Sequence, residues 1–137
     1  MQVAAIILAW VLTAFLAMVY LKAGWFKLTA PLAKLQEAGM GWTGKVGEPG
    51  VRFIAALELL GAAGIVFAPI ASEFLGFGWA QAWGVAAAIG LVLVMVVAIV
   101  MHAVRGETKY TWKINFALLA ASVVLAILLS VYGGALL

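Results

Sequence analysis

Four long apolar runs constrain this chain more than any other feature of its sequence. They cover about 3–21, 51–70, 82–102 and 112–132, and each is close to the roughly 20 residues that a helix needs to cross a bilayer. Only 9% of the 137 residues are charged, whereas a soluble domain carries roughly a quarter. Apolar side chains must therefore cover the exterior as well as the interior. The sequence predicts a single all-α membrane domain over residues 1–137, an up-down bundle of four transmembrane helices.

The segment between the first two runs has a different composition. Pro31 stands where a helix tolerates proline, in the first turn of a short helix predicted over about 30–38. Leu32 and Leu35 share an apolar face with the preceding Leu28. This stretch is too short and too polar to span a bilayer, so we predict an amphipathic helix lying in the membrane interface.

Glycine and proline mark the connections between the runs. Glycines are frequent from residue 39 to residue 50, which predicts a flexible return to the membrane. Pro69 is predicted to end the second span, because a proline inside a helix removes a backbone hydrogen bond. Gly106 is predicted to stop the third span.

Basic residues predict the orientation of the bundle. All eight lie at or near the first and third connections: Lys22, Lys27, Lys34, Lys45, Arg52, Arg105, Lys109 and Lys113. Short loops rich in lysine and arginine stay cytoplasmic, so we predict a multi-pass protein of the cell (inner) membrane with both termini outside. The basic residues flank apolar runs and form no dense patch. The predicted partner is therefore the lipid bilayer and not nucleic acid.

Composition also limits the chemistry. The chain has no cysteine, which excludes dithiol chemistry, disulfides and thiolate metal ligands, and it has one histidine, which excludes a multi-histidine metal site. No nucleophile–base pair, metal quartet or phosphate-binding loop is visible. We therefore predict neither a metal site nor independent catalytic activity.

Strongly polar side chains near the bilayer all fall in its predicted cytoplasmic half. The candidate ligand-binding residues are Glu58, His102, Lys27, Arg105 and Asn115. Glu58 is the most informative, because a carboxylate at helix-centre depth costs at least about 2.5 kcal/mol. It must therefore face the bundle interior, either as a proton- or ligand-binding group or in a structural ion pair with Lys27, Arg52 or Arg105.

The other candidates also have simple structural interpretations. His102 can cap the end of its helix, although a neighbouring Glu58 would let the two groups share a proton. Arg105 can anchor its helix by reaching the interface, and Asn115 can make an interhelical hydrogen bond. Gly61 and Gly64 predict the close approach of a neighbouring helix, either within the bundle or from another protomer.

With these residues in place, the chain resembles the DoxX-like family of small four-helix membrane proteins. The resemblance covers nearly the whole chain and depends on four motifs in order: Gly24-Trp-Phe-Lys27-Leu28; Gly39-Met-Gly41; Glu58-Leu-Leu-Gly61-Ala-Ala-Gly64 with Pro69; and His102 with Arg105. It implies a four-helix up-down bundle in which Lys27, Glu58 and His102 are the family-matching polar positions. It does not imply one activity. Members are associated with redox complexes such as thiosulfate–quinone oxidoreductase, and distant relatives with assembly or chaperone roles.

Three functional hypotheses follow. The first is an accessory or ligand-binding subunit, linked to a redox complex, that holds a quinone- or lipid-like molecule at the polar cluster. The second is a small proton-coupled transporter that uses Glu58. The third is an assembly or chaperone partner in which the cluster is purely structural. Predicted partners are accordingly a membrane-protein subunit or a second copy of the chain.

Overall fold

The computed structural model describes residues 1–133 and consists, over that range, of five helices. They are α1 (Gln2–Thr29), α2 (Leu32–Glu37), α3 (Thr43–Leu75), α4 (Trp79–Val104) and α5 (Thr108–Tyr132). By length and composition, four of these described helices can cross a membrane: α1, α3, α4 and α5. The predicted all-α bundle and its additional short helix are therefore confirmed. The predicted position of the C-terminus falls on residues 134–137, which lie outside the described residues.

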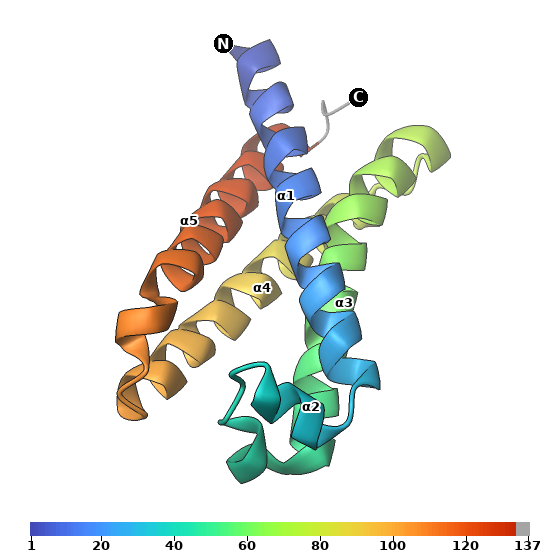
Figure 1. Ribbon diagram of the computed structural model, residues 1–137. Helices are drawn as coiled ribbons and strands as arrows, with labels where there is room; N and C mark the ends of the chain where they lie inside the picture. The colour runs from blue at the N-terminus through green and yellow to red at the C-terminus, as the bar shows by residue number, and fades with distance from the viewer. Residues whose placement is uncertain (134–137) are drawn as a thin grey trace.

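The long helices run alternately up and down, and they form two pairs (Figure 1). α1 packs against α3 and more lightly against α5, while α4 lies between α3 and α5. Figure 1 shows the two pairs, α1 with α3 and α4 with α5, diverging toward the end of the molecule that carries α2. The α4–α5 connection lies at this same end, opposite the start of α1. We call it the α2 end.

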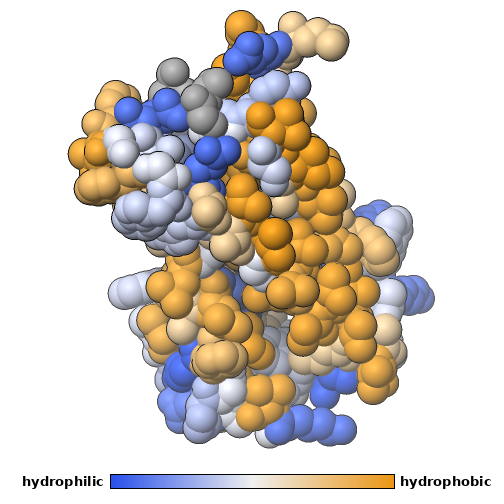
Figure 2. Space-filling view, turned by 180° about the vertical axis from the view of Figure 1, so that it is seen from behind, coloured by the Kyte–Doolittle hydropathy of each residue, from blue (hydrophilic) through white to orange (hydrophobic). Residues whose placement is uncertain are grey.

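Large apolar side chains fill the bundle where the pairs converge. The largest fully buried members of this core come from all four long helices: Leu16, Tyr20, Ile65, Leu91 and Leu125. Many large apolar side chains also face outward, and Figure 2 shows them covering the middle of one face while hydrophilic residues gather mainly toward its ends. That distribution is the one a bilayer requires, because its hydrocarbon layer is flanked by polar headgroups.

Glycines let α3 and α4 approach closely. A Cβ atom added at Gly61 would come within 2.5 Å of Leu91, and one added at Gly64 would come within 2.4 Å of the Ala87 Cβ. Neither separation is compatible with van der Waals contact. The close contact predicted for Gly61 and Gly64 is therefore made inside the bundle, against α4.

The prediction that Pro69 ends the second span is wrong. α3 continues through Pro69 to Leu75 and ends at Gly76, which adopts a left-handed conformation with φ of 68°. A proline costs its helix one hydrogen bond, and buried packing of Pro69 within the bundle offsets that loss.

At its other end, α3 contains a kink. Gly47 has φ of 77°, which is not helical, and it separates a first turn beginning at Thr43 from the main helix. Pro49 then stands in the first turn of that main helix, where its missing N–H breaks no bond. Part of the predicted flexible return, from residue 43 onward, is therefore helical.

Helix α2 packs on protein through its apolar face. Leu35 is fully buried in a small cluster with Ala30, Trp42 and Val51. This cluster holds α2 and the α2–α3 connection against the start of α3. The segment consequently closes the α2 end of the bundle, where the helix pairs are farthest apart.

Candidate functional site

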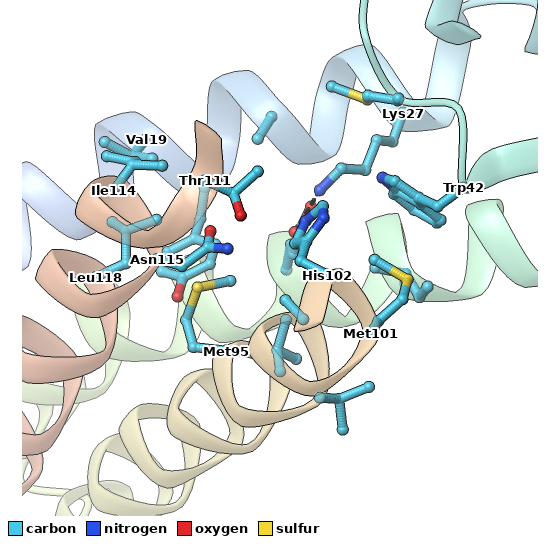
Figure 3. Close-up of a pocket in the computed structure, with 18 of the residues that line it drawn as sticks. Val19, Lys27, Trp42, Met95, Met101, His102, Thr111, Ile114, Asn115 and Leu118 are labelled. Atoms are coloured by element: carbon cyan, nitrogen blue, oxygen red, sulfur yellow. Dashed lines mark hydrogen bonds and ion pairs between the residues drawn. The ribbon is translucent and has the colours of Figure 1, made fainter. Parts of the chain in front are cut away.

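A cavity of about 580 Å³ lies between the diverging helix pairs. All four long helices and the α2–α3 connection contribute to its wall. Its lining is mostly apolar and includes Val19, Ile54, Leu57, Val94, Met95, Ala98, Met101, Ile114 and Leu118. Among these apolar groups stand the polar side chains of Tyr20, Lys27, Glu58, His102, Thr111 and Asn115. Figure 3 shows Lys27, His102 and Asn115 reaching into the cavity from three different helices.

Close packing of α1 on α3 brings Lys27 to Glu58. A Cβ atom at Gly24 would lie 2.9 Å from the Leu59 Cγ and 3.2 Å from the backbone oxygen of Ala55. Only glycine therefore allows this approach without a shift of the neighbouring helix. Lys27 follows one turn later on the same face of α1, so its side chain projects toward α3.

Arg52 holds the end of α1 in this position. Its guanidinium donates to the backbone oxygen of Lys27, which lies in the last turn of α1 and has no partner within that helix. A second nitrogen of Arg52 donates to Glu48 at 2.9 Å. Arg52 is therefore a cap for α1 and not the partner of Glu58.

Lys27 and Glu58 form a buried ion pair. The Lys27 Nζ donates to the Glu58 Oε1 at 2.5 Å, and the two side chains are 11% and 3% exposed. Of the three ion-pair partners considered for Glu58, the structure selects Lys27. The second carboxylate oxygen, Oε2, is buried and makes no hydrogen bond to the described residues. A buried acceptor without a donor is unfavourable, but this oxygen has no surface open to the cavity, so a molecule there would reach it only after a side-chain shift.

A second polar cluster lies at the α2 end, beside the connection between α4 and α5. The Nδ1 of His102 is 2.8 Å from the Glu107 Oε2, and Arg105 donates from Nε to the Glu107 Oε1 at 2.7 Å. These bonds from His102 and Arg105 hold the pKa of Glu107 below its usual range. Glu107 is therefore an ionised acceptor that ties His102, in the last turn of α4, and Arg105, the C-cap residue of that helix, to the connection.

Asn115 and Tyr20 supply the remaining polar groups near the bundle centre. Asn115 is buried on α5 and faces the cavity. Tyr20 is buried on α1, and its hydroxyl is a neighbour of Ser122 but completes no hydrogen bond within the described residues. The Asn115 amide can therefore take part in binding a polar group, whereas the Tyr20 hydroxyl is closed off within the bundle.

The structure brings together four of the five candidate residues. Lys27, Glu58, His102 and Asn115 all line the cavity. Arg105 is not part of the cavity wall, and it is linked to the site through its bond to Glu107.

Sequence reasoning missed Tyr20 and Thr111, which line the cavity, and Glu107, which bonds His102. Tyr20 is not among the residues selected from the sequence, although a hydroxyl on the helix face that also carries Lys27 is a usable signal. Glu107 stands in a polar connection, where nothing in the sequence distinguishes a solvated acid from one that bonds a histidine.

The donor set of the cavity favours an organic ligand with a polar head. Within residues 1–133, no three histidine or acidic side chains gather in a way that could hold a metal ion. The cavity instead offers an ammonium, a carboxylate, an imidazole and a carboxamide within an apolar wall. These groups can bind and orient a head group, and they can exchange protons with it.

The fold and this cavity define a small four-helix integral membrane protein with a polar site inside its bundle. The sequence profile of the DoxX-like family matches residues 11–129, and the chain belongs to that family. No curated protein and no solved structure matches the chain.

Proposed function

We propose that this DoxX-like protein binds a small amphiphilic molecule, quinone- or lipid-like, in the cavity between its helix pairs. The observation that carries this proposal is the cavity of about 580 Å³ with one polar group of side chains in an apolar wall. Ligand pockets usually have volumes of about 300–1,000 Å³ and combine mostly apolar walls with a few polar groups. The protein acts as an accessory subunit that holds its ligand for a membrane redox complex.

The polar groups suit the head of such a molecule. The Lys27 ammonium and the Asn115 amide can donate hydrogen bonds, and the Oε2 of Glu58, which has no partner among the described residues, can accept one once a side-chain shift opens it to the cavity. Because the Lys27–Glu58 pair carries no net charge, a neutral head group can enter without leaving a buried charge unpaired.

The ligand can enter from the lipid. Three residues of the cavity wall, Phe53, Leu57 and Val97, are also exposed on the outer surface of α3 and α4. The cavity thus reaches the side of the bundle that faces hydrocarbon. A hydrophobic tail can remain in the bilayer while the head occupies the polar site.

Native mass spectrometry of the protein extracted with its own lipids tests the proposal directly. We expect a co-purifying molecule with an apolar tail and a polar head, released when Leu57→Trp fills the cavity. Spectra that show only bare protein and exchangeable bulk lipid, for the wild type and Leu57→Trp alike, would contradict the proposal.

A binding measurement then tests the site itself, with n-decylhydroquinone as the probe, kept reduced in the absence of oxygen, because its hydroxyl groups can donate to the Glu58 carboxylate. We expect Glu58→Gln to weaken its binding about tenfold or more, which is the effect of one lost hydrogen bond to a charged group. Glu73→Gln is the matched control, because it makes the same change on α3 but beyond Pro69, at the far end from the cavity. Equal affinity of Glu58→Gln and wild type, with both folded, would count against the site.

One observation favours a second candidate function, that of an assembly partner. The direct ion pair between Lys27 and Glu58 could serve only to join α1 to α3. In that case Glu58→Gln lowers the melting temperature in detergent and leaves probe binding unchanged. Substrate-dependent proton release from vesicles, abolished by the same variant, would instead support the transporter alternative.

A further inference from the structure

His102 lies between the cavity and the aqueous end of the bundle. It is in the last turn of α4, its ring lines the cavity, and its Nδ1 is 2.8 Å from the carboxylate of Glu107. Figure 3 shows the imidazole reaching into the cavity from α4. One edge of the ring is therefore used by Glu107, and the other remains available.

The partner of Nδ1 determines where the imidazole carries its proton. An ionised carboxylate can only accept hydrogen bonds, so Nδ1 must be the donor. Arg105 donates to the other oxygen of Glu107 at 2.7 Å, and the lowered pKa of Glu107 keeps this carboxylate ionised. In the neutral imidazole, Nε2 then bears a lone pair. No hydrogen bond to Nε2 occurs among the described residues.

A second acceptor in the same cavity also lacks a donor. The Oε2 of Glu58 is buried and unbonded, while its Oε1 is already paired with Lys27. Glu58 and His102 come from different helices and line one cavity. The His102 Nε2 faces the cavity as it stands, whereas the Glu58 Oε2 is closed off and would need a side-chain shift. An acceptor without a donor at Nε2 favours a head group that carries hydroxyl hydrogens over one that carries only carbonyl oxygens.

On the basis of the proposed ligand site, we propose that Glu107 is a positioning residue that holds His102 in its Nδ1–H tautomer. The cavity thereby selects an amphiphile with a hydroxyl-bearing head, such as an alkyl hydroquinone, over the corresponding quinone. Glu107 does not touch the ligand. It acts through His102, whose Nε2 accepts a hydrogen bond from the head group, and Arg105 steadies Glu107 from the other side.

The single histidine of the chain makes the tautomer directly measurable. Nitrogen NMR of protein labelled with ¹⁵N-histidine reports the protonation of both ring nitrogens without any ligand. In detergent at about pH 8, we expect a protonated Nδ1 and an unprotonated Nε2. A protonated Nε2, in either the other tautomer or the imidazolium, would overturn the inference.

Three variants show whether Glu107 is responsible. Glu107→Ala should shift the signals toward the Nε2–H tautomer, and Arg105→Ala should shift them less. Glu37→Ala is the control, because it removes an exposed acid that makes no ion pair in the described part of the chain, and it should leave the signals unchanged. Unchanged signals in a folded Glu107→Ala would overturn the positioning role. If Glu107→Ala does not fold, Arg105→Ala takes its place, and unchanged histidine signals in that variant would overturn the positioning role.

Binding of n-decylhydroquinone and n-decylbenzoquinone, measured without oxygen, separates this inference from the proposed function. We expect the wild type to prefer the hydroquinone about tenfold, as one extra hydrogen bond predicts, and Glu107→Ala to lose that preference. Equal binding of both probes would overturn the selectivity and leave the ligand site standing. Binding of neither probe would overturn the proposed site, while the NMR result would still decide the role of Glu107.

Discussion

Lys27 and Glu58 depend on each other at the scale of single residues. Each would be an uncompensated charge in an apolar bundle, and together they form a neutral pair with a separation of 2.5 Å. Removing one partner of a buried pair lowers the stability of the fold far more than replacing both partners with uncharged residues, because the remaining charge stays desolvated. The pair can therefore be a requirement for folding and also part of a ligand site, and measurements of stability alone cannot distinguish these roles.

A double-mutant cycle tests this dependence. We expect Lys27→Met to destabilise the protein by about 3–5 kcal/mol, since it leaves the Glu58 carboxylate unpaired. The double variant Lys27→Met with Glu58→Gln should be closer to the wild type than Lys27→Met is. Thermal unfolding in detergent gives the stability of the wild type, of Lys27→Met, of Glu58→Gln and of the double variant. Additive effects of the two single changes would mean that the residues do not interact.

Glu107 makes a prediction about pH. Its pKa is lowered in the folded protein by bonds from His102 and Arg105, so the stability that it contributes is present above its ordinary pKa of about 4.5. That contribution is lost as the pH falls through the lower pKa of the folded state. We expect the melting temperature of the wild type to fall more steeply than that of Glu107→Ala between about pH 5 and about pH 3. Parallel curves would show that the bonds to Glu107 contribute nothing to stability.

At the scale of the helices, glycine positions decide which pairs pack closely. Gly24 brings α1 against α3, and Gly61 with Gly64 brings α3 against α4. No comparable contact pulls the α1–α3 pair onto the α4–α5 pair at the α2 end, where the cavity lies between them. The cavity thus results from close packing of α1 on α3 and of α3 on α4, combined with looser packing between the two helix pairs at the α2 end.

Two alanine substitutions test the role of close packing. Gly64→Ala should destabilise the bundle by about 1–3 kcal/mol, because its new methyl group would overlap with Ala87. Gly90→Ala is the matched control on α4, where a Cβ meets nothing within 4 Å. This control should be neutral or stabilising by up to about 1 kcal/mol, since alanine favours a helix over glycine. Equal melting temperatures of the two variants would contradict the packing argument.

The two ends of the molecule differ in charge and in the side chains that they expose. The α2 end carries the basic connections, the cavity and both ion-pair clusters, whereas the α3–α4 connection at the other end exposes large apolar and aromatic side chains such as Phe77 and Trp79. The predicted orientation places the α2 end in the cytoplasm. A ligand bound there would lie in the inner leaflet of the membrane.

Cysteine labelling can test this orientation, because the chain has no cysteine of its own. Gly78 stands in open space at the α3–α4 connection, and Lys109 is exposed near the α4–α5 connection. We expect a membrane-impermeant maleimide to label Gly78→Cys in intact cells and Lys109→Cys only after the cells are permeabilised. The reverse pattern would show that the start of α1 and the end of α5 face the cytoplasm.

The site was only partly predictable, for a reason that the particular residues make clear. Glu58, Lys27, His102 and Asn115 could be selected from sequence, because each is a polar group whose place in an apolar bundle demands a partner or a cavity. Their pairing could not be predicted. Lys27, Arg52 and Arg105 were equally plausible partners for Glu58, because the choice depends on how each helix is rotated about its axis.

Sequence alone determined that the chain spans a membrane with four helices, since long apolar runs have no other stable solution in lipid or in water. It also determined which half of the bundle is polar. Only the tertiary structure decided that Pro69 stays within α3, that Lys27 pairs with Glu58, and that a cavity separates the helix pairs at the α2 end. These outcomes depend on contacts between helices distant in sequence, where the placement of a single glycine or methyl group determines how closely two backbones approach.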